Sequence, residues 1–344
     1  MRNKYVFVTA LLLVLALLGF MFTRGYVKME EKGSKEELLV VTSFYPMYVA
    51  TRNVVGDCAG VRVENLSEPQ TGCLHDYQLT PQDMILLSKA DVFVVNGGGI
   101  EGFLTEVASA YPELTIINAG AEIFDEDDAD DDREEDVHED DADGVHEEDV
   151  HADDTDGGHA EDMHSSHEEH NHGENAHAWM SIPHYKQQVT TICEGLSARN
   201  PANKEEYERN MSKYLEQVDG IWQEAKELAA SAQGKSILIF HEAFAYVAED
   251  YGMQVAGVLD LDEERQVSAG EIADILKVIK EKNVKIILAE ELYGKDMGDT
   301  IERESDCTVY YLDTLVRGDG AADSWLVGME HNIEILRKAV REGQ

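Results

Sequence analysis

Short apolar runs that alternate with helical stretches are the feature that most constrains how this chain can fold. Eight of these runs have the length of a strand, and they form two series of four. The runs span 38–46, 61–68, 91–97 and 114–120 in the first series, and 236–244, 253–261, 284–292 and 307–315 in the second. Strands that alternate with helices build parallel sheets covered by helices. The sequence therefore predicts two α/β lobes, each with a mostly parallel four-stranded sheet.

A long amphipathic stretch separates the two series. Asn200 is a suitable helix cap, and Pro201 fits the first helical turn. Apolar side chains then recur at steps of three and four, as one helix face requires. They are Tyr207, Met211, Tyr214, Leu215, Val218, Ile221, Trp222, Ala225 and Leu228. About 30 helical residues span roughly 45 Å, so residues 200–233 are predicted to form a rigid helix that bridges an N-terminal lobe (36–199) and a C-terminal lobe (234–344).

An acidic, histidine-rich tract interrupts the N-terminal lobe. The formal net charge of the 344-residue chain is -42, and residues 125–174 carry 25 acidic side chains against one arginine. Three 13-residue repeats, which begin at 135, 148 and 161, each place histidine at their fourth and twelfth positions. Residues 122–175 have almost no side chains able to build a core, so they are predicted to be a disordered insertion. Their negative field argues against a nucleic-acid partner and attracts cations.

The N-terminus indicates export. Arg2 and Lys4 precede the uncharged, apolar residues 5–22, which are just long enough to cross a bilayer as a helix. A positive flank before such a segment places the rest of the chain outside the cytoplasm. Residues 1–35 are therefore interpreted as an uncleaved membrane anchor, with a cleaved signal peptide as the alternative. The body of the protein is expected in the periplasm or at the cell surface.

Four cysteines are consistent with an exported protein, in which disulfides can form. Cys58 and Cys73 lie close in sequence and are the expected pair. Cys193 is predicted to lie on a helix and Cys307 at the start of a strand. No C-x-x-C spacing occurs, which argues against a zinc site made of cysteines.

Four potential metal ligands follow predicted strands or the acidic tract. His75 follows the second strand, His177 opens the segment HAWMSIPH, His241 ends a strand, and Asp313 ends the last strand. Ligands gather at the carboxyl ends of parallel strands, although each residue taken singly also fits a capping or turn role. Three imidazoles and one carboxylate suit four-coordinate zinc, with manganese as the alternative.

Several segments resemble, in the same order, the extracytoplasmic metal-binding proteins of zinc and manganese ABC importers. The segments are VVTSFYPMYVATRNVVGD, HDYQLTPQDM, NGGGIEGF, NAHAWMSI, FHEAFAYVAEDYGM, AEELYGKDMGDTIERES and YYLDTL. The resemblance covers about residues 38–344 apart from the tract. It implies two lobes with a metal in the cleft between them, ligated by His75, His177 and His241, with Asp313 as the fourth ligand. In some zinc-binding members, a water or another carboxylate takes that last place.

The resemblance also implies what the protein does. It implies a monomer that captures Zn²⁺ as the transported ligand, with Mn²⁺ as the alternative, and delivers it to the permease of an ABC importer. NAHA departs from the family pattern, because Asp-Pro usually precedes the histidine. The histidines of the tract are interpreted as a loop that collects zinc weakly, with a solvated linker as the alternative. They are His138, His146, His151, His159, His164, His167, His170 and His172.

Other functions fit the residues less well. Gly97, Gly99 and Gly102 have the spacing of a dinucleotide fingerprint, but they follow the third strand of the lobe, so a tight turn is preferred. HEAFA begins like a zinc-protease signature, but Ala245 stands where the second histidine belongs. A zinc-dependent hydrolase needs an open coordination position, which a fourth protein ligand removes, so the chain is predicted not to be an enzyme. A cell-surface adhesin or a metal buffer remains compatible with the same fold.

Overall fold

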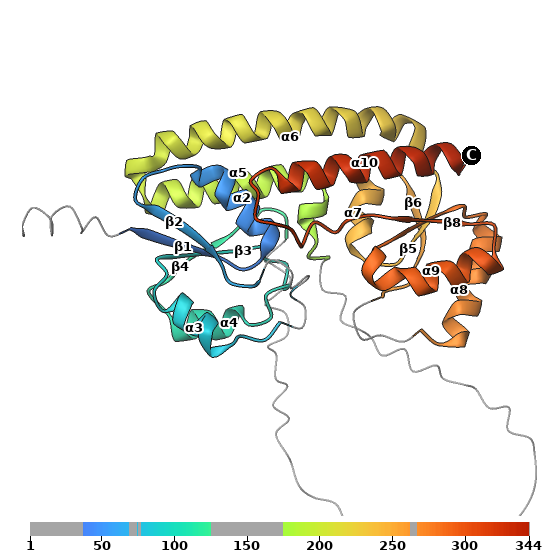
Figure 1. Ribbon diagram of the computed structural model, residues 1–344, viewed down its shortest axis with the longest axis horizontal. Helices are drawn as coiled ribbons and strands as arrows, with labels where there is room; N and C mark the ends of the chain where they lie inside the picture. The colour runs from blue at the N-terminus through green and yellow to red at the C-terminus, as the bar shows by residue number, and fades with distance from the viewer. Residues whose placement is uncertain (1–36, 69–73, 75–76, 125–174, 262–266, 344) are drawn as a thin grey trace, which may run out of the picture.

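The computed structural model describes residues 37–68, 74, 77–124, 175–261 and 267–343 of the chain. Two parallel sheets of four strands lie side by side, and long helices run across both of them (Figure 1). The predicted fold class is therefore confirmed. The predicted anchor (1–35) and residues 125–174 of the predicted insertion lie outside the described residues. None of the described helices is long and apolar enough to cross a membrane.

The two sheets repeat one strand order. The N-terminal sheet has the order β2-β1-β3-β4, and the C-terminal sheet has the order β6-β5-β7-β8. Every neighbouring pair is parallel. The strands are β1 (Leu38–Thr42), β2 (Val61–Asn65), β3 (Val92–Val95), β4 (Thr115–Asn118), β5 (Ser236–Ile239), β6 (Gln254–Val258), β7 (Ile286–Ala289) and β8 (Thr308–Tyr311).

The strands end earlier than the predicted apolar runs, because the chain turns into a loop or helix at each carboxyl end. The helices around the N-terminal sheet are α2 (Tyr45–Val55), α3 (Pro81–Leu87), α4 (Leu104–Ala110) and α5 (Ile182–Arg199), with the short 3-10 helices η2 (Ala178–Met180) and η3 (Pro201–Asn203). Those that follow are α6 (Lys204–Ala232), α7 (Ala243–Asp250), α8 (Ala269–Lys282), α9 (Glu291–Glu304) and α10 (Ser324–Glu342).

The long helix α6 runs along the top of both lobes in Figure 1, as the bridging helix was expected to do. Six of the nine side chains predicted on its apolar face are buried, together with Ala232. The buried side chains are Tyr207, Tyr214, Val218, Ile221, Ala225, Leu228 and Ala232. Burial of each large apolar side chain contributes about 1.5–3 kcal/mol, so this face stabilises the connection between the lobes.

The last helix, α10, is a second connection that the sequence did not predict. Its first turn packs in the N-terminal lobe, where the Trp325 ring stacks on Tyr185 of α5 at a centroid distance of 3.9 Å. The hydroxyl of Tyr45 also donates to Ser324 Oγ over 3.0 Å. The helix then runs beside α6 toward β8 of the other lobe (Figure 1). Residues 324–342 therefore belong to both lobes, whereas the sequence assigned them to the C-terminal lobe.

The expected disulfide between Cys58 and Cys73 stays a prediction, because only one of the two cysteines is described. Cys58 is buried, and so are Cys193 on α5 and Cys307 beside β8. Cys73 itself lies outside the described residues.

Candidate metal centre

His177 is held in the interior where the two lobes meet. Only 1% of the residue is exposed, and its Nδ1 lies 2.8 Å from Asn175 Oδ1. The ring lies 5.1 Å from the ring of Trp179, which is itself fully buried. Trp179 Nε1 donates to the carbonyl of Thr314, beyond β8, over 2.9 Å. His177 therefore sits on a short 3-10 turn whose position depends on contacts with both lobes.

His241 approaches from the C-terminal lobe. It follows β5 and precedes α7, and its Nδ1 accepts a hydrogen bond from the backbone N–H of Ala243 over 3.0 Å. The centroids of the His241 and His177 rings are 4.8 Å apart, with an angle of 85° between the ring planes. The structure thus brings together two of the predicted site residues, one from each lobe.

The other two predicted site residues differ from this pair. His75 lies outside the described residues, although Leu74 beside it is buried in the N-terminal core. Asp313 follows β8 as predicted, but its Oδ1 accepts from the backbone N–H of Leu315 over 2.7 Å. Within the described part of the chain, no three His, Cys, Asp or Glu residues are close enough to hold a metal ion. The structure therefore does not bring the Asp313 carboxylate to the two imidazoles.

A buried polar network supports the loop that carries His177. Glu101 Oε1 accepts from Ser43 Oγ (2.8 Å) and from the Asn96 N–H (2.7 Å), and Oε2 accepts from the Gly97 N–H (3.1 Å). Asn96 Nδ2 donates to the carbonyl of Ala176 over 2.8 Å, next to His177. Burial raises the pKa of Glu101, and the three donors oppose that rise.

The glycine-rich turn is tight, as the sequence interpretation expected. Gly97 has φ +85°, and a Cβ there would lie 2.3 Å from Asn118 Oδ1. Only glycine fits a backbone with this φ and so close a neighbour. The roles of Asn96 and Glu101 were missed by sequence reasoning. Both residues lie in the segment NGGGIEGF, which is the sequence pattern that could have indicated their roles.

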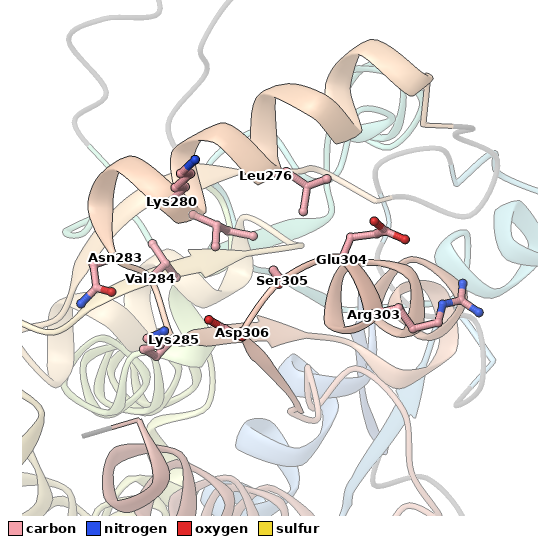
Figure 2. A pocket seen from close by; sticks show the side chains of 10 residues that line it. Leu276, Lys280, Asn283, Val284, Lys285, Arg303, Glu304, Ser305 and Asp306 are labelled. Atoms are coloured by element: carbon pink, nitrogen blue, oxygen red, sulfur yellow. The ribbon is translucent and has the colours of Figure 1, made fainter.

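A separate cavity of about 640 Å³ lies at the other end of the C-terminal sheet. Figure 2 shows charged side chains around it, including Lys280, Lys285, Arg303 and Asp306. Lys285 and Asp306 precede β7 and β8, whereas His241 follows β5. The cavity therefore lies at the amino ends of these parallel strands, and it is not part of the metal centre.

The chain is similar in sequence to two proteins that are named for zinc or manganese. The high-affinity zinc uptake system protein ZnuA of Bacillus subtilis is 29% identical over 310 residues, which cover 90% of this chain and 86% of that protein. The manganese-binding lipoprotein MntA of Halalkalibacterium halodurans is 23% identical over 315 residues, which cover 89% and 90% of the two chains.

A solved structure has the same fold. The solute-binding protein FpvC of Pseudomonas aeruginosa, in complex with Ni²⁺, matches with a TM-score of 0.69 at 22% identity. The match covers 90% of this chain and 98% of FpvC. The ZnuA family, described as zinc-uptake complex component A, periplasmic, matches residues 40–339. Because that match spans most of the chain, this protein belongs to the ZnuA family.

Proposed function

We propose that this protein captures Zn²⁺ tightly outside the cytoplasm and delivers it to the permease of an ABC importer. The observation that carries the proposal is the pair of imidazoles, His177 and His241, whose ring centroids lie 4.8 Å apart where the lobes meet. Two ligands from different lobes make metal binding depend on how the lobes sit relative to each other. If the relative position of the lobes changes when metal binds, a permease can distinguish the metal-bound protein from the metal-free protein.

His75 and Asp313 are proposed to complete the coordination. Residues on both sides of His75 are anchored in the N-terminal lobe: Leu74 is buried, and the hydroxyl of Tyr77 donates to Asp83 over 3.0 Å. Asp313 is less well placed, because its carboxylate must leave the N–H of Leu315 in order to reach a metal. We therefore expect the three imidazoles to supply most of the affinity. They bind as neutral groups, so affinity falls in acid.

The donor set favours zinc over manganese. Imidazole nitrogen is a good ligand for zinc, whereas manganese prefers carboxylate, carbonyl and water oxygen. The relative named for manganese keeps Mn²⁺ as the second candidate. A zinc-dependent hydrolase is less well supported, because four protein ligands leave no position for a reacting water.

The histidine-rich tract is proposed to collect zinc weakly and to raise its concentration near the tight site. Eight histidines stand among 25 acidic residues between 125 and 174, so imidazole ligands and a field that attracts cations occur together. We further propose that residues 1–35 anchor a monomeric protein to the membrane, with its body outside the cytoplasm.

Native mass spectrometry with added Zn²⁺ tests the proposal. We expect the intact chain to bind one zinc tightly and several weakly, and a chain without residues 125–174 to keep only the tight one. His177→Ala and His241→Ala should each lose the tight zinc. His331→Ala is the matched control, because His331 lies exposed on α10, outside the proposed ligand set. Unchanged tight binding by His241→Ala would contradict the proposed ligand set.

A further inference from the structure

Asn175, which precedes the metal centre by two residues, makes hydrogen bonds on both sides of the lobe junction. Its Oδ1 lies 3.1 Å from the His177 backbone N and 2.8 Å from His177 Nδ1. Its Nδ2 donates to the carbonyl of Glu242, the residue after His241, over 2.8 Å. Its own carbonyl accepts from the hydroxyl of Tyr246 on α7 over 2.7 Å. One asparagine is thus bonded to both segments that carry an imidazole.

The backbone partners fix which way the Asn175 amide points. The carbonyl of Glu242 can only accept, so it must face the NH₂ group of the amide. The backbone N–H of His177 can only donate, so it must face the amide oxygen. The orientation of the amide therefore follows from two groups whose roles are unambiguous.

The same orientation determines the tautomer of His177. The amide oxygen also faces Nδ1 of the ring, and an oxygen acceptor pairs only with a protonated nitrogen. Neutral His177 therefore carries its proton on Nδ1, and Nε2 is the ring nitrogen without a proton. A hydrogen bond of this kind fixes the tautomer and the ring orientation of a metal-binding histidine.

We propose that Asn175 is a positioning residue that presets His177 for metal binding and ties it to the segment that carries His241. The inference rests on the proposed zinc function, because it concerns the tautomer and orientation of a histidine in that same site. An aspartate at this position could accept from His177 but could not donate to the carbonyl of Glu242. Asparagine is therefore suited to both roles at once.

The first test is the tautomer of His177 in the metal-free, full-length protein. Long-range ¹H–¹⁵N NMR spectra identify the protonated ring nitrogen, and the loss of signals in His177→Ala assigns them. We expect Nδ1–H in the wild type and in Asn175→Asp, and a mixture of tautomers in Asn175→Ala. An Nε2–H ring in the wild type, or the same tautomer in wild type and Asn175→Ala, would overturn the proposal.

The second test is the affinity for Zn²⁺, measured by competition with a chelator. Asn175→Ala should bind zinc about 10- to 100-fold more weakly, as is usual when the partner of a metal-binding histidine is lost. Asn175→Asp should recover part of that loss but remain weaker than the wild type, because the bond to Glu242 is missing. Binding by Asn175→Asp as tight as the wild type would refute the tie between the segments.

Two further variants separate positioning from general loss of structure. Tyr246→Phe removes the hydroxyl that bonds to the Asn175 carbonyl and should weaken zinc binding by about 2- to 10-fold, which is the value of one hydrogen bond. Asn53→Ala is the matched control, since Asn53 bonds to Ala322 on another part of the surface and should not alter affinity. If the wild-type protein bound no zinc tightly, the proposed function would be wrong. The tautomer of His177 in metal-free protein would still show whether Asn175 positions the ring.

Discussion

The two lobes repeat one strand order, but the carboxylates that follow two corresponding strands are held in different ways. Glu101 follows β3 and accepts hydrogen bonds only from neutral donors of its own lobe, among them Ser43 Oγ and two backbone N–H groups. Glu290 follows β7, the corresponding strand, and its Oε1 lies 3.3 Å from Nη1 of Arg317. The N-terminal lobe therefore stabilises its carboxylate locally, whereas the C-terminal lobe uses a cation from the segment after β8.

The two imidazoles also differ, in their exposure and in the hydrogen bond that each Nδ1 makes. His177 is 1% exposed, and its Nδ1 faces an amide oxygen, whereas His241 is partly exposed and its Nδ1 accepts from the N–H of Ala243. Since Nδ1 of His241 accepts, a neutral His241 carries its proton on Nε2. In the proposed zinc site, His177 can therefore keep its Nδ1 hydrogen bond when Nε2 binds the metal. His241 must instead release the N–H of Ala243 before its Nε2 can bind.

The largest expected loss of stability comes from removal of Trp179, the side chain that packs against His177. Trp179→Ala deletes a fully buried indole that packs against Phe44, at a centroid distance of 4.9 Å, and bonds to Thr314. We expect a loss of about 3–5 kcal/mol in the free energy of unfolding, measured with urea on metal-free protein. Trp222→Ala on α6, where the ring is only partly buried, is the control and should cost less. Equal losses would show that Trp179 has no special place at the junction.

The next effect concerns a carboxylate that joins the lobes directly. Asp250, at the end of α7, accepts from Ser181 Oγ (3.0 Å) and from the N–H of Ile182 (2.8 Å) at the start of α5. Burial raises the pKa of Asp250 from 3.8 to about 6. The folded chain therefore binds more protons than the unfolded chain between these two values. Accordingly, the contribution of Asp250 to the free energy of unfolding falls as the pH rises through that window.

Urea unfolding of metal-free wild type and Asp250→Asn at several pH values measures this contribution. The other acidic residues are common to both proteins, so the difference between the two curves isolates Asp250. Relative to the variant, the wild type should lose up to about 3 kcal/mol between pH 4 and pH 7, since one pKa unit corresponds to about 1.4 kcal/mol. Parallel curves would mean that the pKa of Asp250 is not raised.

Local patterns in the sequence were enough to predict both sheets, whereas the pairing of His177 with His241 was implied by the resemblance to metal-binding proteins. Buried parallel strands appear as apolar runs, and Val92–Val95 is an example in which every residue is buried. The expectation that His241 lies at the carboxyl end of a strand agrees with its position after β5, and its role as a ligand stays a prediction. The sequence indicates His177 as a potential ligand because an aromatic segment typical of folded protein begins there after the acidic tract.

Features that depend on distant partners could not be predicted in this way. The stacking of Trp325 on Tyr185 makes α10 a second bridge, and nothing near Trp325 in the sequence indicates that partner. Asp313 has the residue type and place of a ligand, yet its carboxylate is bonded within a turn in which Leu315 has φ +60°. Asn175 stands at the edge of the tract, so its bonds to Glu242 and Tyr246 became visible only in the fold.

A smaller effect is expected from the ion pair of the C-terminal lobe. Arg317→Met keeps the length of the side chain but leaves Glu290, whose side chain is only 12% exposed, without its cation. We expect a loss of about 1–3 kcal/mol in the free energy of unfolding, because a largely buried charge loses a hydrogen-bonding partner. The control is Arg199→Met, since its pair with Asp91 is well exposed and should be worth about 0–1 kcal/mol. The double variant Arg317→Met, Glu290→Gln should recover part of the loss. Similar losses for Arg317→Met and Arg199→Met would remove the contrast drawn between Glu290 and Glu101.

The smallest effect tests the difference between the two imidazoles most directly. If His241 must release the N–H of Ala243 in order to bind zinc, that amide loses its hydrogen bond when the metal is added. Hydrogen exchange measured by NMR should therefore be slower at Ala243 in metal-free protein than in zinc-loaded protein, relative to the neighbouring amides of α7. The backbone N–H of His177, which bonds to Asn175, should show no such change. Unchanged exchange at Ala243 on zinc binding would mean that His241 binds without rearrangement, and both halves of the site would then be equally ready for the metal.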